Sequence, residues 1–196
     1  VFFVIFLFHI VATIMELFKT NPAIDSWAYP GIQGTFFAIL TVPLFTGFLY
    51  SAIGSYISRS FLYLFLTFVS FPSYFHLWIL APLIYLNFFT HHFFYDIRYF
   101  LFLYILIIFY KTKVNFQVYK IKRSMPFLLT VLLTSLFVWI AENIGTFTHI
   151  WLYPNQIQNW QLVYFNKIGS WFLLLILSFA LVSIIYRDKL KYSNQK

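Results

Sequence analysis

The sequence predicts an all-α membrane protein, a bundle of about six transmembrane helices that contains a parallel internal repeat. Of its 196 residues, 62% are hydrophobic and 9% are charged, whereas a soluble domain carries about 25% charged residues. Apolar runs recur along the whole chain, and a motif of Glu followed by Trp-x-Tyr-Pro occurs twice. We therefore expect a single integral membrane domain over residues 1–196.

Five apolar runs approach or reach the roughly 20 residues that a helix needs to cross the bilayer core. They are residues 1–18, 35–57, 76–94, 125–145 and 166–186. A sixth run, 97–110, is short, so a helix there must tilt or let its flanking cations reach the interface. Between the second and third runs, Arg59, Pro72 and many aromatic side chains predict an interfacial helix or re-entrant segment over 58–75.

The distribution of basic residues predicts the orientation. With six spans, three of the thirteen Lys and Arg residues fall on one side, namely Lys19, Arg98 and Lys167. The other ten fall on the opposite side, which is therefore expected to be cytoplasmic. They are Arg59, Lys111, Lys113, Lys120, Lys122, Arg123, Arg187, Lys189, Lys191 and Lys196. The C-terminal tail is then cytoplasmic, and the net charge of +8 reflects topology, so we expect no nucleic-acid partner.

The first and last pairs of spans run in the same directions across the membrane. Residues 1–57 and 125–187 are therefore expected to be parallel repeat units, with a central hairpin over 76–110 between them. Because Val1 lies inside an apolar run, we expect the natural N-terminus to lie before it. The oligomeric state is left open.

The repeated motif supplies the candidate site. Glu16 precedes Trp27 and Tyr29, and Glu142 precedes Trp151 and Tyr153, each at the outer end of an apolar run. An ionisable group within a membrane segment is costly and marks a functional site by default. The structural alternative is a carboxylate that pairs with a neighbour such as Lys19, Arg98 or a loop tyrosine.

Further polar residues are expected at the same end of the bundle. As candidate acid–base groups we take Glu16, Glu142, His91 and Asp96, and as candidate substrate- or ion-binding groups Asn87, His92, Arg98, Asn143, Trp27, Tyr29, Trp151 and Tyr153. The alternative for the residues between 87 and 98 is a hydrogen-bond network that ties one hairpin together.

Two carboxyl groups in a site of low dielectric suit proton chemistry, because one can be held neutral and the other charged. Such a pair can protonate a double bond and stabilise the resulting carbocation beside aromatic rings. Our favoured hypothesis is acid–base modification of a long apolar, isoprenoid-like membrane lipid. A transporter or channel for a cation, proton or small solute is one alternative, and a non-catalytic assembly or sensor protein is another.

A metal centre is the less favoured alternative, and we predict no cofactor. Two glutamates and several histidines suit zinc or a di-iron centre. However, the chain contains no His-Glu-x-x-His and no Glu-x-x-His pattern, and it has no cysteine that could supply a thiolate.

Long strings of the chain resemble a known family, the bacterial integral membrane proteins grouped as domain-of-unknown-function family 817. The matching strings are Ser26-Trp27-Ala28-Tyr29-Pro30, Asn87-Phe88-Phe89-Thr90-His91-His92, Ala141-Glu142-Asn143-Ile144-Gly145 and Lys167-Ile168-Gly169-Ser170-Trp171. The resemblance covers residues 16 to 187 and implies a multi-pass protein of the bacterial inner membrane. Asp25, Gly31 and Tyr95 depart from the family pattern, and the family implies no activity.

The first repeat unit is also loosely similar to membrane carotenoid hydratases and lycopene cyclases. The similarity lies in Glu16, the Trp27-Ala28-Tyr29 loop and the Val42-Pro43-Leu44 run. It implies chemistry on an isoprenoid, in agreement with the role proposed for the carboxylates.

Overall fold

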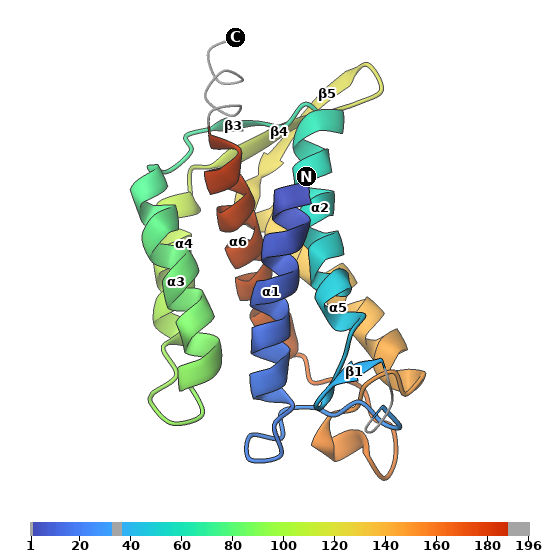
Figure 1. Ribbon diagram of the computed structural model, residues 1–196. Helices are drawn as coiled ribbons and strands as arrows, with labels where there is room; N and C mark the ends of the chain where they lie inside the picture. Colours follow the sequence, from blue (N-terminus) through green and yellow to red (C-terminus); the bar gives the residue numbers. More distant parts are fainter. Residues whose placement is uncertain (1, 33–36, 188–196) are drawn as a thin grey trace.

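The computed structural model describes residues 2–32 and 37–187, which form six α-helices, one short 3₁₀ helix and two small antiparallel sheets (Figure 1). The helices are α1 (Phe2–Lys19), α2 (Thr46–Tyr63), α3 (Tyr74–Thr90), α4 (Arg98–Phe109), α5 (Phe127–Phe147), η1 (Pro154–Gln156) and α6 (Lys167–Ile185). The strands are β1 (Ala38–Ile39), β2 (Val42–Pro43), β3 (Thr67–Val69), β4 (Lys113–Val118) and β5 (Ile121–Pro126). The protein is therefore mainly helical, but the two sheets correct the all-α prediction.

Three of the described helices are long and apolar enough to cross a membrane, namely α1, α5 and α6. This indicates a membrane protein. Helices α3 and α4 are apolar but shorter, with 17 and 12 residues. Helix α2 has 18 residues but is more polar, because it contains several serines and Arg59.

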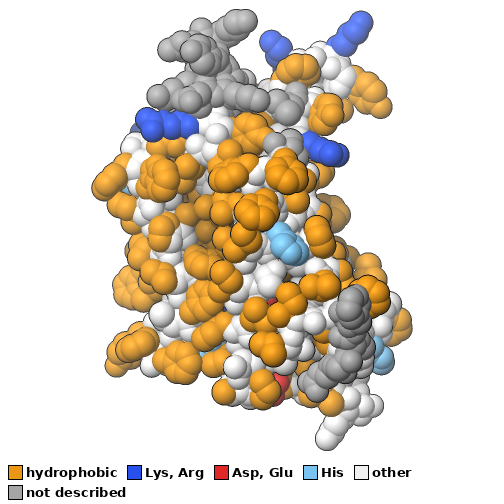
Figure 2. All heavy atoms as spheres, in the orientation of Figure 1, with side chains coloured by type: hydrophobic (Ala, Val, Ile, Leu, Met, Phe, Trp, Pro, Cys, Tyr) orange, Lys and Arg blue, Asp and Glu red, His pale blue; other side chains and the backbone are white. Residues whose placement is uncertain are grey.

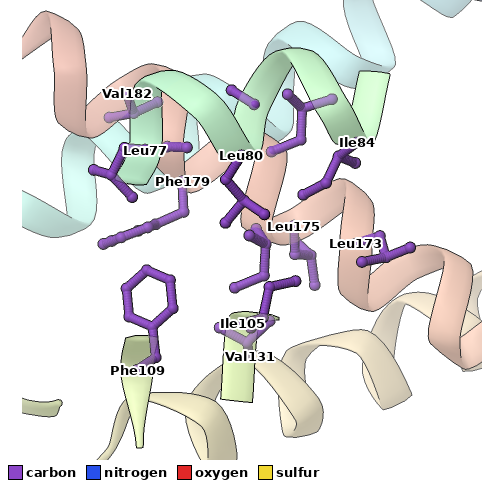
Figure 3. Packing of buried hydrophobic residues seen from close by; sticks show 14 of the residues in the cluster. Leu77, Leu80, Ile84, Ile105, Phe109, Val131, Leu173, Leu175, Phe179 and Val182 are labelled. Carbon is purple, nitrogen blue, oxygen red and sulfur yellow. The ribbon is translucent and has the colours of Figure 1, made fainter. Parts of the chain in front are cut away.

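Helix α6 lies at the centre of the bundle, where it contacts α2, α3 and α5, while α1 packs along α2. The core between α3, α4, α5 and α6 is mainly apolar, although Ser135 of α5 and Ser183 of α6 are also buried. Leu80 of α3, Ile105 and Phe109 of α4, and Leu175 and Phe179 of α6 belong to one buried cluster, in which Leu175 and Phe179 lie between the α3 and α4 side chains (Figure 3). The outer surface is also largely apolar (Figure 2), which is typical of a protein embedded in hydrocarbon.

The predicted helix over 35–57 is wrong at its start. Residues 38–43 form the β1–β2 hairpin, in which Leu40 has a positive φ of 55°. Pro43 lacks a backbone N–H and fixes its own φ, so a regular helix cannot run through it unchanged. The Thr46 hydroxyl donates to the Pro43 carbonyl oxygen at 2.9 Å, and α2 begins at Thr46.

The predicted interfacial segment over 58–75 is also wrong. Its first part, including Arg59, continues α2 to Tyr63, and its second part forms β3. Strand β3 pairs antiparallel with β4, and β4 pairs with β5 around a tight turn at Tyr119 and Lys120. The basic segment over 111–124 is therefore mostly a β-hairpin rather than a loop, because its backbone groups find partners in this sheet.

The sheet formed by β3, β4 and β5 lies at one end of the bundle, and the two Trp-x-Tyr-Pro loops lie at the other (Figure 1). Lys and Arg side chains gather at the sheet end of the face shown in Figure 2. Lys189, Lys191 and Lys196, which the sequence places on the same side, lie outside the described residues.

Candidate functional site

A cavity of about 340 Å³ opens at the end of the bundle that carries the Trp-x-Tyr-Pro loops, and both motif glutamates line it. Glu16 comes from the last turn of α1 and is 2% exposed, and Glu142 comes from α5 and is 3% exposed. The two acidic side chains, which are more than 120 residues apart in sequence, therefore share one cavity. Its volume falls near the lower end of the about 300–1,000 Å³ that is usual for ligand sites.

The Glu16 carboxylate is held by side chains of the loop that follows α1. Its Oε2 accepts hydrogen bonds from Trp27 Nε1 at 2.9 Å and from the Tyr29 hydroxyl at 2.8 Å. The phenol of Tyr50, on α2, also interacts with this carboxyl group and lines the cavity. Burial and the nearby carboxylate raise the pKa of Tyr29, so its hydroxyl remains a donor at physiological pH.

The Glu142 carboxylate is held in a similar way, but with one difference. Its Oε1 accepts a short hydrogen bond from the Tyr153 hydroxyl, and its Oε2 accepts one from Trp171 Nε1 at 2.7 Å. The indole donor thus comes from α6 and not from Trp151 of the motif. The Trp151 ring instead packs against Gly145 and lines the cavity.

The two motif loops are joined directly to each other. The N–H of Ala28 donates to the carbonyl oxygen of Leu152, and the N–H of Leu152 donates to that of Ala28, both at 2.9 Å. Ala28 and Leu152 are the middle residues of the two Trp-x-Tyr sequences. This antiparallel bridge holds Tyr29 and Tyr153 over their carboxylates.

Three basic side chains line the same cavity, Lys19, Arg98 and Lys167, and form a basic cluster. Lys19 is 3% exposed, and its Nζ lies 2.7 Å from His92 Nε2. Lys167 Nζ lies 4.1 Å from the centroid of the Tyr153 ring. Arg98 pairs with Asp96 at 3.1 Å, and no other ion pair forms among the described residues.

The two adjacent histidines line the cavity beside the basic cluster. Partial burial, and then the nearby charges of Lys19, His91 and Lys167, lower the pKa of His92 to about 4. His91, whose Nδ1 lies 2.7 Å from the Asn87 carbonyl oxygen, also has a lowered pKa because of burial. Both imidazoles are therefore neutral at pH 7. His92 Nε2 can then accept a hydrogen bond from the Lys19 ammonium group, which acts only as a donor.

Three of the candidate residues do not line the cavity. Asn87 and Asp96 form one network, in which the Asn87 amide donates to Asp96 Oδ1 at 3.1 Å. Burial alone would raise the pKa of Asp96, but bonds from Asn87 and the Arg98 backbone lower it. Asn143 accepts from the Val163 backbone N–H at 2.9 Å. Asn87 and Asp96 thus connect segments of one hairpin, as the alternative of a hydrogen-bond network predicts. Asn143 connects α5 to the segment before α6.

The other candidates, Glu16, Glu142, His91, His92, Arg98, Trp27, Tyr29, Trp151 and Tyr153, all line the cavity. Sequence reasoning missed Tyr50 and Trp171 as partners of the carboxylates. Each is the fifth residue of the helix after its loop, α2 or α6. That shared position in the two units is the signal that could have identified both. Among the described residues, no group of three or more His, Asp and Glu side chains is placed to hold a metal ion.

The sequence profile of the family described as "Protein of unknown function (DUF817)" matches residues 2–179. The "Uncharacterized protein YoaT" of Bacillus subtilis (strain 168) is 43% identical over 186 residues, which cover 95% of this chain and 69% of that protein. No solved structure matches the chain significantly. The resemblance to domain-of-unknown-function family 817 is thus confirmed, and the chain belongs to the DUF817 family.

Proposed function

We propose that this protein is a multi-pass enzyme of the bacterial inner membrane that modifies a long apolar, isoprenoid-like lipid by acid–base chemistry. The observation that carries the proposal is the shared cavity, in which two buried carboxyl groups meet an apolar wall. The wall comes from several helices and includes Leu49, Ile53, Phe88, Val138 and Leu174. Apolar walls with a few placed polar groups are typical of sites for small apolar ligands.

The proposed topology has six crossings, with the cavity in the outer half of the membrane and the C-terminal tail in the cytoplasm. It is supported by the separation of the basic hairpin from the cavity end of the bundle (Figure 1). In this arrangement the chain is one membrane domain with repeat units 1–57 and 125–187 around a central hairpin at 76–110.

The parallel repeat is supported by the bridge between the loops. Two mutual hydrogen bonds between Ala28 and Leu152, which are equivalent in the two motifs, are what a two-fold axis through the bridge produces. Tyr50 and Trp171 add a second equivalent pair, because each reaches its glutamate from the same position of its helix. An axis of this kind, along the membrane normal, relates parallel repeats.

The nearby charges favour different roles for the two glutamates. Glu142 accepts two hydrogen bonds and is also attracted by Lys167, and both effects favour its charged carboxylate. Glu16 accepts bonds from Trp27, Tyr29 and Tyr50, but no described cation is among the groups that act on it. We therefore assign Glu16 as the acid that protonates a carbon–carbon double bond. Glu142 then stabilises the carbocation beside the aromatic rings and takes a proton from an adjacent carbon, which gives an isomerised product.

Transport of a cation or proton is the second candidate, and the structure supports it less. A transporter needs a route from the cavity to the opposite face of the membrane. Beyond the cavity, the bundle is filled by the apolar cluster that includes Leu80, Ile105 and Phe109. Such a cluster offers no partner for an ion or its water.

The test is lipid profiling by mass spectrometry of cells that overproduce the protein or its variants. Wild-type protein is expected to change the profile of apolar lipids, and Glu16→Gln and Glu142→Gln are each expected to abolish the change. Asp25→Asn, in an exposed loop, is the matched control and is expected to behave as wild type. Identical profiles for wild type and both glutamine variants, at equal amounts of folded protein, would contradict the proposal.

A further inference from the structure

The acidic and basic side chains that line the cavity do not form ion pairs with one another. Glu16 and Glu142 accept hydrogen bonds from neutral indole and phenol groups. Arg98 is paired with Asp96, but neither Lys19 nor Lys167 forms an ion pair with a described residue. Lys19 is buried, and the nearby positive charges of Lys167 and Arg98 repel its ammonium group. A buried charge without a counter-ion is costly unless a ligand supplies one.

The partners that these two lysines do have are neutral. Lys19 reaches His92, whose Nε2 lies at 2.7 Å, and His92 also lies 3.4 Å from the Ser26 hydroxyl. Lys167 lies over the Tyr153 ring and is attracted by Glu142 without forming an ion pair with it. Both lysines line the cavity, and an ammonium group has three N–H donors that it can offer to a bound molecule.

We infer that the basic cluster of Lys19, Arg98 and Lys167 binds the phosphate-type head group of an amphiphile whose apolar chain lies against the cavity wall. The inference rests on the proposed function, in that the cavity is taken as the lipid site, and it specifies the class of substrate. It adds a recognition element that the two glutamates do not provide.

The donors of the basic cluster suit a phosphate group. Asp96 compensates Arg98, so Lys19 and Lys167 remain without an ion pair among the described residues, and only Lys167 is attracted by a nearby carboxyl group, that of Glu142. A phosphate monoester carries about −1.5 to −2 charges at pH 7 and has several strong acceptor oxygens. The same positive field repels cations, which counts against a cation as the ligand.

The size and composition of the cavity require that the ligand also has an apolar part. Leu49 and Ile53 of α2 and Val138 of α5 line the same space as the lysines. A volume of about 340 Å³ holds a head group and only the first part of a long chain. The remainder of the chain must leave the cavity, and the surrounding bilayer is the medium that suits it.

The experiment measures thermal unfolding of the purified protein in a neutral maltoside detergent with three added probes. The probes are farnesyl phosphate, farnesol, which has the same chain without the charge, and inorganic phosphate, which has no chain. Farnesyl phosphate is expected to raise the unfolding midpoint with an apparent Kd at least about tenfold below that of either other probe.

Two variants test the assignment to the basic cluster. Lys19→Gln and Lys167→Gln are each expected to weaken binding of farnesyl phosphate by about tenfold or more. Lys19→Arg keeps the charge and is expected to retain most of the affinity, which also shows that the position tolerates substitution. Lys122→Gln, on the exposed hairpin at the other end, is the matched control and should bind as wild type does.

Three results would overturn the inference: equal binding of farnesol, equal binding of inorganic phosphate alone, or unchanged affinity in both glutamine variants. Equal binding of inorganic phosphate would point to a free anion as the ligand. Because binding is measured without turnover, the two proposals can fail separately. Charge-dependent binding with no glutamate-dependent change in lipids would reject only the proposed reaction, and the converse would reject only the head-group site.

Discussion

Ala28 and Leu152 exchange two backbone hydrogen bonds of 2.9 Å across 124 positions of the sequence. This bridge fixes the two Trp-x-Tyr loops to each other, and each loop contributes a tyrosine that donates to a buried glutamate. The loops and the carboxylates therefore form one connected polar unit at the end of an otherwise apolar bundle. We therefore expect a change in one loop to alter the hydrogen bonds of the glutamate that the other loop holds.

The first prediction concerns this bridge. Ala28→Pro removes the donor N–H of residue 28 and leaves the Leu152 carbonyl oxygen without its partner, which costs about 1–3 kcal/mol for a buried group. Amide hydrogen exchange, measured by mass spectrometry, is expected to become faster in both loops, at residues 20–32 and 148–160. Leu152→Ala keeps the backbone donor and is the control. Faster exchange confined to residues 20–32 would show that the loops are independent.

The second prediction concerns the two donors to Glu142. Trp171→Phe and Tyr153→Phe each remove one bond to the carboxylate, and the double variant leaves the carboxylate with neither. We expect an interaction energy of about 0.5–3 kcal/mol in the free energy of unfolding, because both donors serve the same buried acceptor. As the control cycle, Tyr153→Phe is combined with Tyr85→Phe, whose hydroxyl donates to the Val11 carbonyl oxygen instead. Additive effects in the first cycle would show that the two donors act separately.

The third prediction concerns the pH dependence of stability. The pKa of His92 is about 4 in the folded protein, below its usual value near 6.5, and that of His91 is lowered in the same direction. At these two histidines the unfolded chain therefore binds more protons between pH 4 and 6.5. Their contribution to stability falls as the pH is lowered through this range and is constant above it.

The measurement is the thermal unfolding midpoint in detergent at steps from pH 4.5 to 7.5. His92→Gln is expected to reduce the loss of stability on acidification, because residue 92 no longer titrates. His149→Gln is the control, since His149 lies in the turn after α5 and is not among the residues that line the cavity. The same slope in wild type and His92→Gln would contradict the assignment.

Much of this site was predictable because intramembrane charge is rare and therefore informative. Glu16 and Glu142 could be identified from the apolar runs that precede them, and the repeated motif located the loops. The donors Tyr50 and Trp171 were missed because aromatic residues are abundant in this chain, with 28 Phe and 15 Tyr. One phenol or indole among so many carries little information unless its position is compared between the two repeat units.

The fold was predictable where apolar periodicity decides it and not where backbone pairing does. The expected runs at 1–18, 125–145 and 166–186 match α1, α5 and α6 to within a few residues. The sheet of β3, β4 and β5 was missed because β3 and β4 are more than 40 residues apart. Its strands are short, and their pairing depends on the ends of α2 and α4 meeting in space, which local sequence does not encode.

The fourth prediction concerns Asn143, which joins α5 to the segment before α6. Its side chain donates to the Trp139 carbonyl oxygen at 2.8 Å and accepts from the Val163 N–H at 2.9 Å. Val163 is buried, so Asn143→Ala leaves its N–H unsatisfied and is expected to lower stability by about 1–3 kcal/mol. Asn166→Ala, at an exposed position that gives no side-chain cap to α6, is the control. Equal unfolding midpoints for the two variants would show that Asn143 has no connecting role.

The last prediction concerns the close approach of Trp151 to helix α5. A Cβ added at Gly145 would overlap the Trp151 ring, whereas one added at Gly169 would meet only the end of Phe102, at 3.0 Å. The indole is rigid and is followed directly by the bridge residue Leu152, so it cannot move without disturbing the bridge. Gly145→Ala is expected to cost about 1–3 kcal/mol of stability through overpacking, and to speed hydrogen exchange in residues 148–160. Gly169→Ala is expected neither to lower stability nor to speed hydrogen exchange, because the end of the Phe102 side chain can move aside. If the two variants unfold at the same midpoint and exchange alike, the position of Trp151 does not depend on the glycine beneath it.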